Sequence, residues 1–279
     1  YKMRNSFFTF SLTTLALFFA TTSSLTAQPS TSSRARNGWK LLWAAEFSKD
    51  EINTKKWHVF EGADPQNSDL WYSAREKNVR VKDGVLVLEA HHEEDLKGKE
   101  GSAKLTSGRI QTASKDGALA SFKYGRIEAR IRFSTISGTL GRFTTVGTDF
   151  YEKSWPKCGE INVVEYLPRS PSQIWNTLRY EDKKGQQAKA DNKGFNPFKK
   201  NMSRRKKFKT YVLEWNETEL VFFCNNRVTH SVSLKDTVKL KLNPYKKSHF
   251  LLLAQSIGAW GGEYKVSDLP SKMEVDWVR

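Results

Sequence analysis

Cysteine, proline and glycine are all scarce in this chain of 279 residues. Two cysteines cannot crosslink a chain of this length, so a disulfide-stapled scaffold is excluded. Eight prolines and 17 glycines are too few for a collagen-like or low-complexity chain. No segment after residue 38 shows a long amphipathic helical period, an internal repeat or a second domain boundary. With 38% hydrophobic residues, the chain can bury one sizeable core.

Basic residues are in clear excess, and the formal net charge is +16. Such a charge is typical of proteins that bind nucleic acid or another anionic polymer. Several of these residues lie in one run, Lys199-Lys200 and Arg204-Arg205-Lys206-Lys207. A solvated loop between strands is the favoured interpretation of this run, with contact to an anionic polymer or surface second. We predict no nucleic-acid partner.

The amino-terminal residues have the pattern of a secretory signal peptide, which we assign to residues 1–27. Lys2 and Arg4 form a basic start, residues 7–20 are apolar or hydroxylated without a charge, and Ala27 precedes the expected cleavage. The apolar run is short for a membrane span, and no cysteine follows it that could carry a lipid. Residues 28–38 are predicted to be a flexible lead-in and residues 39–279 a single domain. We expect a secreted, periplasmic or cell-surface protein without a membrane span after processing.

Strand signals recur along the predicted domain. Ile127, Ala129 and Ile131 alternate with arginine and glutamate, which is typical of a half-buried strand. Residues 79–88 predict a hairpin around Lys82-Asp83-Gly84, and residues 250–253 a strand buried on both faces. Aromatic residues, which favour strands, make up 13% of the chain. Short strands with frequent turns indicate a β-sandwich or barrel.

Residues 155–166 combine an apolar strand pattern with two glutamates. On a regular strand Glu160 and Asn162 share one face, and Glu165 points to the other. One extra residue at Val163-Val164, accommodated as a β-bulge, returns Glu165 to that face. The two carboxyl groups can then approach to about 5–5.5 Å, the separation in retaining glycosidases. Two glutamates on a solvated edge explain this pattern equally well.

The segment Glu160-Ile161-Asn162-Val163-Val164-Glu165 resembles the Glu-x-Asp-x-x-Glu signature of family 16 glycoside hydrolases, in the laminarinase-like branch. Further segments along the chain are similar to the family's strands in the same order. These are Trp39–Trp43 with Glu46-Phe47 as an opening strand, Asn78–Ala90, Thr106–Ile110, Tyr124–Arg130, Phe208–Trp215, Ile257–Gly262 and Val275–Arg279. The resemblance implies an all-β, concanavalin-like jelly roll of two curved antiparallel sheets, with the glycan in a concave cleft.

The resemblance also implies roles for individual residues. Glu160 would be the nucleophile and Glu165 the acid and then the base, with Asn162 where the family has aspartate. We expect slower turnover from this asparagine, because it removes one negative charge that would raise the pKa of the acid. Further residues match positions that contact or line the glycan site: Asn67, Arg109, Trp155, Arg179 and Trp260. The alternatives are a turn asparagine, a strand-edge salt bridge and tryptophans that only pack.

Further departures from the family pattern fall in the expected cleft. Leu140 and Thr144 stand where relatives carry tryptophans that stack on sugars, and Arg179 stands where they carry histidine. Arg142 adds a second basic group nearby. These changes suit either a shifted substrate, such as an acidic or sulfated glycan, or a degraded active site.

Relatives often hold a structural calcium ion, and Glu46 and Asp276 match positions that contribute to it. We expect no cofactor to be required for the reaction. Cys158 and Cys224 are predicted to be buried free thiols. The combined expectation is a monomeric, retaining endo-β-glycanase acting on a polysaccharide, first of all a β-1,3-linked glucan. The alternatives are another family 16 glycan (β-galactan, sulfated algal or mucin-type) and a catalytically weak glycan-binding protein.

Overall fold

The computed structural model describes residues 38–94, 103–191, 194–195, 206–235 and 243–279. The predicted signal peptide (1–27) and nearly all of the predicted lead-in (28–38) lie outside these residues. So does most of the basic run that begins at Lys199. Among the described residues, no helix is long and apolar enough to cross a membrane.

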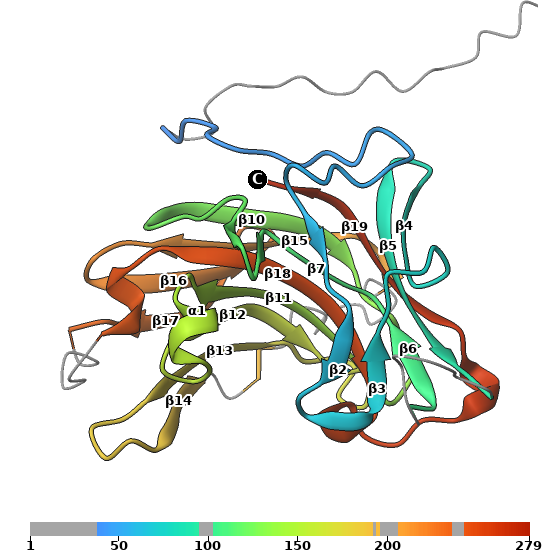
Figure 1. Ribbon diagram of the computed structural model, residues 1–279. Coiled ribbons are helices and arrows are strands. Elements are labelled where there is room, and N and C mark those ends of the chain that lie inside the picture. The colour runs from blue at the N-terminus through green and yellow to red at the C-terminus, as the bar shows by residue number, and fades with distance from the viewer. Residues whose placement is uncertain (1–37, 95–102, 192–193, 196–205, 236–242) are drawn as a thin grey trace, which may run out of the picture. The chain divides into compact units, whose positions relative to one another are not determined.

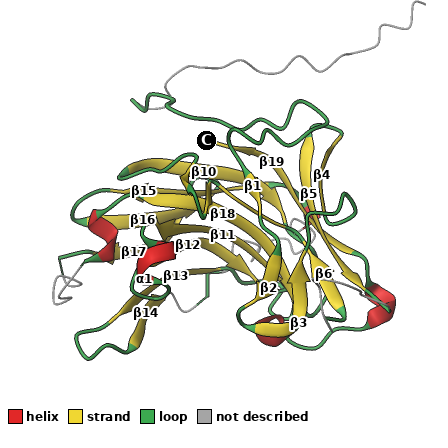
Figure 2. Cartoon of the chain, viewed as in Figure 1, coloured by secondary structure: helices red, strands yellow, loops and turns green. Residues whose placement is uncertain are grey.

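Strands dominate the described chain and form two large sheets (Figures 1 and 2). The seven-stranded sheet has the order β1 (His58–Val59), β7 (Arg109–Gln111), β18 (His249–Ile257), β11 (Thr139–Gly147), β12 (Glu160–Tyr166), β13 (Trp175–Glu181) and β14 (Gln187–Asp191). All its pairings are antiparallel.

The ten-stranded sheet is antiparallel except for the parallel pair β3–β6. Its order is β17 (Arg227–Ser233), β16 (Glu219–Cys224), β15 (Lys209–Trp215), β10 (Gly125–Arg132), β19 (Ser271–Val278), β5 (Val85–His92), β6 (Leu105–Ser107), β3 (Asn67–Tyr72) and β2 (Gly62–Asp64), with β4 (Val79–Lys82) paired to β5. The remaining elements are the pair β8 (Ala113–Ser114) and β9 (Gly117–Ala118), and the short helices α1 (Phe150–Lys153), η4 (Pro244–Lys246), η5 (Ala259–Gly261) and η6 (Val266–Asp268).

The main hydrophobic core contains side chains from both sheets. Ile131 and Tyr211 come from the ten-stranded sheet, and Val163 and Leu253 from the seven-stranded one. The alternation predicted for residues 126–133 is confirmed, because Ile127, Ala129 and Ile131 are buried while Glu128 and Arg130 between them are half-buried. The hairpin at 79–88 and the buried strand at 250–253 are confirmed as well.

One predicted strand is wrong. Residues 39–43 form no strand, and only Ala45 in this region makes a bridge, to Val278 of β19. The two cysteines are buried free thiols, as expected.

The seven-stranded sheet has an outer face, which we define as the face turned away from the main core. It carries Arg142, Glu165 and their cross-strand neighbours, because paired residues point to the same side. Helix α1 packs at one end of this face: the Phe150 ring lies edge-on to Phe250, with centroids 6.3 Å apart. The side chain of Tyr151 also accepts a hydrogen bond from Gln111.

Candidate active site

Strand β12 presents both predicted glutamates on the outer face. Arg142 of β11 pairs with Glu165, whereas Thr144 pairs with Asn162, so β12 has one residue more than β11 over this interval. The pairing with β13 shifts at the same place. The predicted bulge at Val163-Val164 is therefore confirmed. Both valines stay in the core, and the glutamates on either side of them face the same way.

Asn162 is fully buried between β11 and Glu160. Its Nδ2 donates a 2.6 Å hydrogen bond to Glu160 Oε1, and its Oδ1 accepts one of 2.6 Å from Thr144 Oγ1. The threonine that replaces an expected tryptophan thus fixes the orientation of the amide. Asn162 in turn fixes one oxygen of Glu160 and satisfies it as an acceptor.

Glu165 is buried, with 2% of the residue exposed. Its Oε2 accepts a 2.9 Å hydrogen bond from Thr177 Oγ1 of β13. Burial is the largest influence on the carboxyl group and raises its pKa to about 7. The charges of Arg179 and Arg142 act in the opposite direction, while Glu160 raises the pKa further. A group with such a pKa can exist in either protonation state near neutral pH.

Arg179 lies opposite Glu160 in the β12–β13 register and reaches both carboxylates. Its Nε is 3.6 Å from Glu160 Oε1, and its Nη2 is 4.0 Å from Glu165 Oε1. The guanidinium also lies 5.8 Å from the ring centre of Trp260, on η5. Trp260 is 37% exposed, so part of its ring is open to solvent. These two predicted glycan-site residues are therefore brought to the carboxylate pair.

Arg142 joins the carboxylate pair to a second polar cluster. Its Nη2 donates bonds of 3.3 Å to Tyr72 Oη and Ser256 Oγ, and lies 4.0 Å from Asp64 Oδ2. Tyr72 donates a 2.8 Å bond to Asp64, and its Oη is 2.5 Å from Ser256 Oγ. The sequence motifs did not indicate Asp64, Tyr72 or Ser256, because these residues meet Arg142 only through the long-range arrangement of β2, β3 and β18.

Arg109 is buried on β7, which the strands β18 and β11 separate from the glutamates of β12. Its Nε and Nη2 donate to Gln111 Oε1 at 3.1 and 2.7 Å, and its guanidinium stacks 4.0 Å from the ring centre of Phe60. Burial lowers the pKa of the guanidinium. Among the described residues it has no salt bridge within 4 Å, so the strand-edge salt bridge considered for it is not observed.

Asn67 and Trp155 are less directly connected to the carboxylates. Asn67 Nδ2 donates a 2.7 Å bond to the carbonyl of Ile257, just before the loop that carries Trp260. This is a structural contact of the kind expected for a turn asparagine. Trp155 is half-buried against the smaller core cluster, which includes Cys158. Roles for Asn67 and Trp155 in glycan binding stay predictions.

The outer face offers little aromatic surface where relatives were expected to carry tryptophans. Leu140 and Thr144 are 3% and 2% exposed and present no open ring. Trp175 of β13 pairs in register with Glu165 and is half-buried on the same face. The sequence motifs did not indicate Trp175, because only the pairing of β12 with β13 places it next to Glu165.

The predicted calcium ligands are engaged elsewhere. Glu46 accepts bonds of 2.8 and 3.0 Å from Arg279, and Asp276 pairs with Arg130. Within the described parts of the chain, no group of three or more histidine, cysteine or acidic side chains is arranged to hold a metal. These two carboxylates do not fit a calcium site as arranged, and the ion stays a prediction without support from these contacts.

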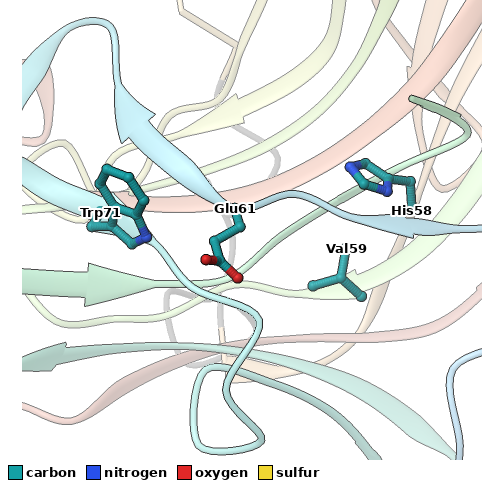
Figure 3. Close-up of a pocket in the computed structure, with 4 residues that line it drawn as sticks. All are labelled: His58, Val59, Glu61 and Trp71. Carbon is teal, nitrogen blue, oxygen red and sulfur yellow. The ribbon is translucent and has the colours of Figure 1, made fainter. Parts of the chain in front are cut away.

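A separate pocket of about 620 Å³ lies at the edge of the sheets (Figure 3). It is lined by His58 and Val59 of β1, by Glu61 between β1 and β2, and by Trp71 of β3. Val59 packs on the main core and pairs with Ile110, so it lies on the side of β1 opposite the outer face. The pocket contains neither Glu160 nor Glu165.

The fold and the site define a class, a jelly-roll β-sandwich with paired carboxylates on the outer face of its smaller sheet. The model of Glycosyl hydrolases family 16 matches residues 66–279, and the chain belongs to this family. The laminarinase-like resemblance is thereby confirmed, together with the fold that it implied.

Two curated relatives are both glucan-degrading by name. The chain is 29% identical over 262 residues to a Beta-glucanase of Rhodothermus marinus, covering 86% of this chain and 84% of that protein. It is 25% identical over 263 residues to Glucan endo-1,3-beta-glucosidase A1 of Niallia circulans, covering 87% of this chain. The chain spans only 38% of the length of that second relative.

Among solved structures, one neighbour comes from a study of endo-acting O-glycanases that prominent human gut microbiota express to initiate mucin breakdown. It matches with a TM-score of 0.74 at 25% identity, covering 88% of this chain and 91% of the other. The same sandwich therefore occurs in relatives with different glycan substrates.

Proposed function

We propose that the protein is a retaining, endo-acting β-glycoside hydrolase in which Glu160 is the nucleophile and Glu165 the general acid and base. The observation that carries this proposal is the bulge at Val163-Val164, which puts the two glutamates on one face while keeping Glu165 buried. A carboxylate fixed by a hydrogen bond beside a carboxyl group with a pKa of about 7 suits the two roles.

The reaction proceeds in two displacements. In the first, a carboxylate oxygen of Glu160 bonds to the anomeric carbon as the glycosidic C–O bond breaks, and Glu165 gives its proton to the leaving oxygen. In the second, Glu165 takes a proton from water, the water oxygen attacks the anomeric carbon, and the bond to Glu160 breaks. Each displacement inverts the anomeric centre, so the product keeps the configuration of the substrate. No cofactor enters either step.

Three neighbours support these roles without reacting. Asn162 orients Glu160 through its 2.6 Å bond, and Thr177 orients Glu165 through its 2.9 Å bond. Arg179 provides a positive charge near both carboxylates, 3.6 Å from Glu160 and 4.0 Å from Glu165. These are positioning roles, because each acts through a glutamate.

A β-1,3-linked glucan is the first-choice substrate, because both curated relatives named above are glucan-degrading enzymes. Substrate contacts are proposed for residues around the outer face: Asn67, Arg109, Trp155, Arg179 and Trp260. The second candidate is another family 16 glycan, such as a mucin-type chain, which the O-glycanase structure at 25% identity favours. Asn162 in place of the expected aspartate favours a third, a glycan-binding protein with weak catalysis.

The same proposal includes secretion directed by residues 1–27, which suits an enzyme acting on polymers that cannot enter the cell. The test of secretion is expression of the full chain with its leader and recovery of the processed protein outside the cytoplasm. Retention of an unprocessed chain in the cytoplasm would contradict it.

Reducing-end release from a panel of soluble β-glucans, β-galactans and mucin glycans tests the enzymatic proposal. We expect release of oligosaccharides from at least one member, and its loss in Glu160→Gln. Glu214→Gln is the matched control, since Glu214 is a strand glutamate that pairs with Arg126 on the ten-stranded sheet, to which β12 does not belong. Binding of a glycan without release would instead establish the binding protein, and release that survives Glu160→Gln would refute the assigned nucleophile.

A further inference from the structure

Arg179 has hydrogen-bond donors that no described residue of the protein accepts. Its distances of 3.6 and 4.0 Å to the two glutamates are ion-pair distances, too long for hydrogen bonds. Within the described residues, its guanidinium makes no hydrogen bond at all. The side chain is 17% exposed and lies beside the open ring of Trp260. An incoming ligand therefore meets unfilled, charged donors next to a surface on which a sugar can stack.

Arg142 repeats this arrangement on the other side of the carboxylate pair. It lies opposite Glu165 on β11, as Arg179 lies opposite Glu160 on β13. Its two hydrogen bonds are both long, at 3.3 Å, and its buried Nε has no partner among the described residues. Two incompletely satisfied guanidinium groups thus flank the glutamates from both neighbouring strands.

These two cations oppose the chemistry proposed for the site. The general acid must be protonated, yet the charges of Arg179 and Arg142 both lower the pKa of Glu165. The other groups that face Glu165 are Glu160, which raises its pKa, and Thr177, whose hydrogen bond lowers it. Burying an arginine without a full set of partners also costs free energy. Both disadvantages disappear when an anion binds the guanidinium groups.

We propose that Arg142 and Arg179 bind an anionic substituent of the glycan, a sulfate ester or a carboxylate, and make the site selective for anionic β-glycans over neutral ones. The planar guanidinium offers two parallel N–H groups that match the oxygen atoms of either anion. This inference rests on the proposed function of the site and narrows its substrate class. It makes no statement about the backbone linkage of the glycan.

The test compares matched neutral and anionic chains on one backbone. Laminarin, chemically sulfated laminarin and carboxymethylated laminarin form one set, and keratan sulfate with desulfated keratan forms a second. We expect kcat/KM to be at least about tenfold higher for an anionic member than for its neutral parent, which corresponds to one well-formed charged contact. The sulfated and carboxymethylated arms distinguish the two anion types.

Variants identify the residues responsible. In Arg179→Gln the ratio of anionic to neutral kcat/KM is expected to fall towards one, and Arg142→Gln is expected to lower it as well. Using the ratio removes any general loss of activity that these changes cause. Arg126→Gln, on the ten-stranded sheet, is the control and is expected to keep the ratio. Equal rates on neutral and anionic chains, or a preference that survives both substitutions, would overturn the proposal.

A binding measurement separates this proposal from the catalytic one. Calorimetric titration of Glu160→Gln with sulfated, carboxymethylated and neutral laminarin oligosaccharides needs no hydrolysis. Tighter binding of an anionic oligosaccharide that is lost in Glu160→Gln/Arg179→Gln supports the anion subsite even if the wild-type protein hydrolyses nothing. Hydrolysis of neutral glycans with no anion preference in binding supports the enzyme and refutes the subsite.

Discussion

The arginines of the two sheets differ in how the protein satisfies them. On the ten-stranded sheet, Arg126 pairs with Glu128 and Glu214 at 2.9 and 2.5 Å, and Arg132 pairs with Glu274 at 2.5 Å. On the outer face of the seven-stranded sheet, the carboxylates of described residues lie 3.6 to 4.0 Å from Arg142 and Arg179. One sheet completes its ion pairs internally, and the other does not.

This difference follows from the role proposed for each surface, structural on the ten-stranded sheet and catalytic on the seven-stranded sheet. Arginines of β10 alternate with core residues, and their carboxylate partners on neighbouring strands hold an exposed surface in register. The two carboxylates beside Arg179 are instead the groups proposed to react, and Arg142 pairs in register with one of them, Glu165. A carboxylate locked in a close bidentate ion pair would be a poor nucleophile or acid, so distance here preserves reactivity.

The largest effect is expected from removing the reacting carboxylate. Glu160→Gln should lower kcat by at least about a thousandfold, because the amide cannot form the glycosyl–enzyme bond. Glu214→Gln, which removes a paired carboxylate from the other sheet, should leave kcat within about twofold. Steady-state rates on one hydrolysed glycan, with thermal melting as a folding check, measure both. Similar losses in the two variants would remove the functional distinction between the sheets.

The pH dependence of the wild-type protein should be the next largest effect. Glu165 must be protonated to act as the acid, and its pKa is raised to about 7, mainly by burial. Activity is therefore expected to fall about tenfold per pH unit once the pH exceeds roughly 7 to 8. A kcat/KM profile measured on a neutral glycan, with buffers matched in ionic strength, tests this. A profile that stays flat up to pH 9 would contradict the assignment of Glu165.

Asn162→Asp tests the effect of one further charge beside the two glutamates, and we expect it to change the rate less than the two preceding effects do. It adds one negative charge beside Glu160, which should raise the pKa of Glu165 and move the alkaline limb of the profile to higher pH. Turnover is expected to rise several-fold. Asn162→Ala, which removes the 2.6 Å bond without adding charge, is the matched control and should lower the rate. Equal rates for the wild-type and aspartate forms would show that the asparagine does not slow the enzyme.

The smallest effect is expected on the ten-stranded sheet. Arg130→Gln removes an ion pair with Asp276 in which both side chains are about one-third exposed or more, so it should cost only about 0–1 kcal/mol of stability. Urea unfolding at low and high salt measures this, and the cost should shrink as salt rises. A loss of several kcal/mol of unfolding free energy would mean that this ion pair contributes far more than a solvent-screened surface pair.

Local patterns predicted the scaffold and the central strand well. The alternation in residues 126–132 and the spacing of Glu160 and Glu165 each correspond to a structural feature of one strand, a half-buried face and a bulge. Such features depend on residues close in sequence, so they can be inferred without knowing the partners. The expected strand at 39–43 failed because pairing there depends on a distant strand, β19, which forms a bridge in this region only to Ala45.

The polar surroundings of the glutamates were harder to predict. Tyr72 and Trp175 reach the site through the pairing of distant segments, and a register cannot be read from either segment alone. Family resemblance indicated Arg179 as a site residue, but its position between both carboxylates depends on the β12–β13 register. For Asn67 the resemblance indicated a sugar contact, and the observed contact is with the carbonyl of Ile257.

The stereochemistry of hydrolysis tests the central claim most directly, that Glu160 and Glu165 act as nucleophile and acid in two displacements. Proton NMR during the first minutes of hydrolysis of a β-linked oligosaccharide distinguishes the anomers of the new reducing end before mutarotation mixes them. The account predicts that the β anomer appears first and the α anomer follows slowly. Initial appearance of the α anomer would mean a single displacement by water and would contradict the roles assigned to both glutamates.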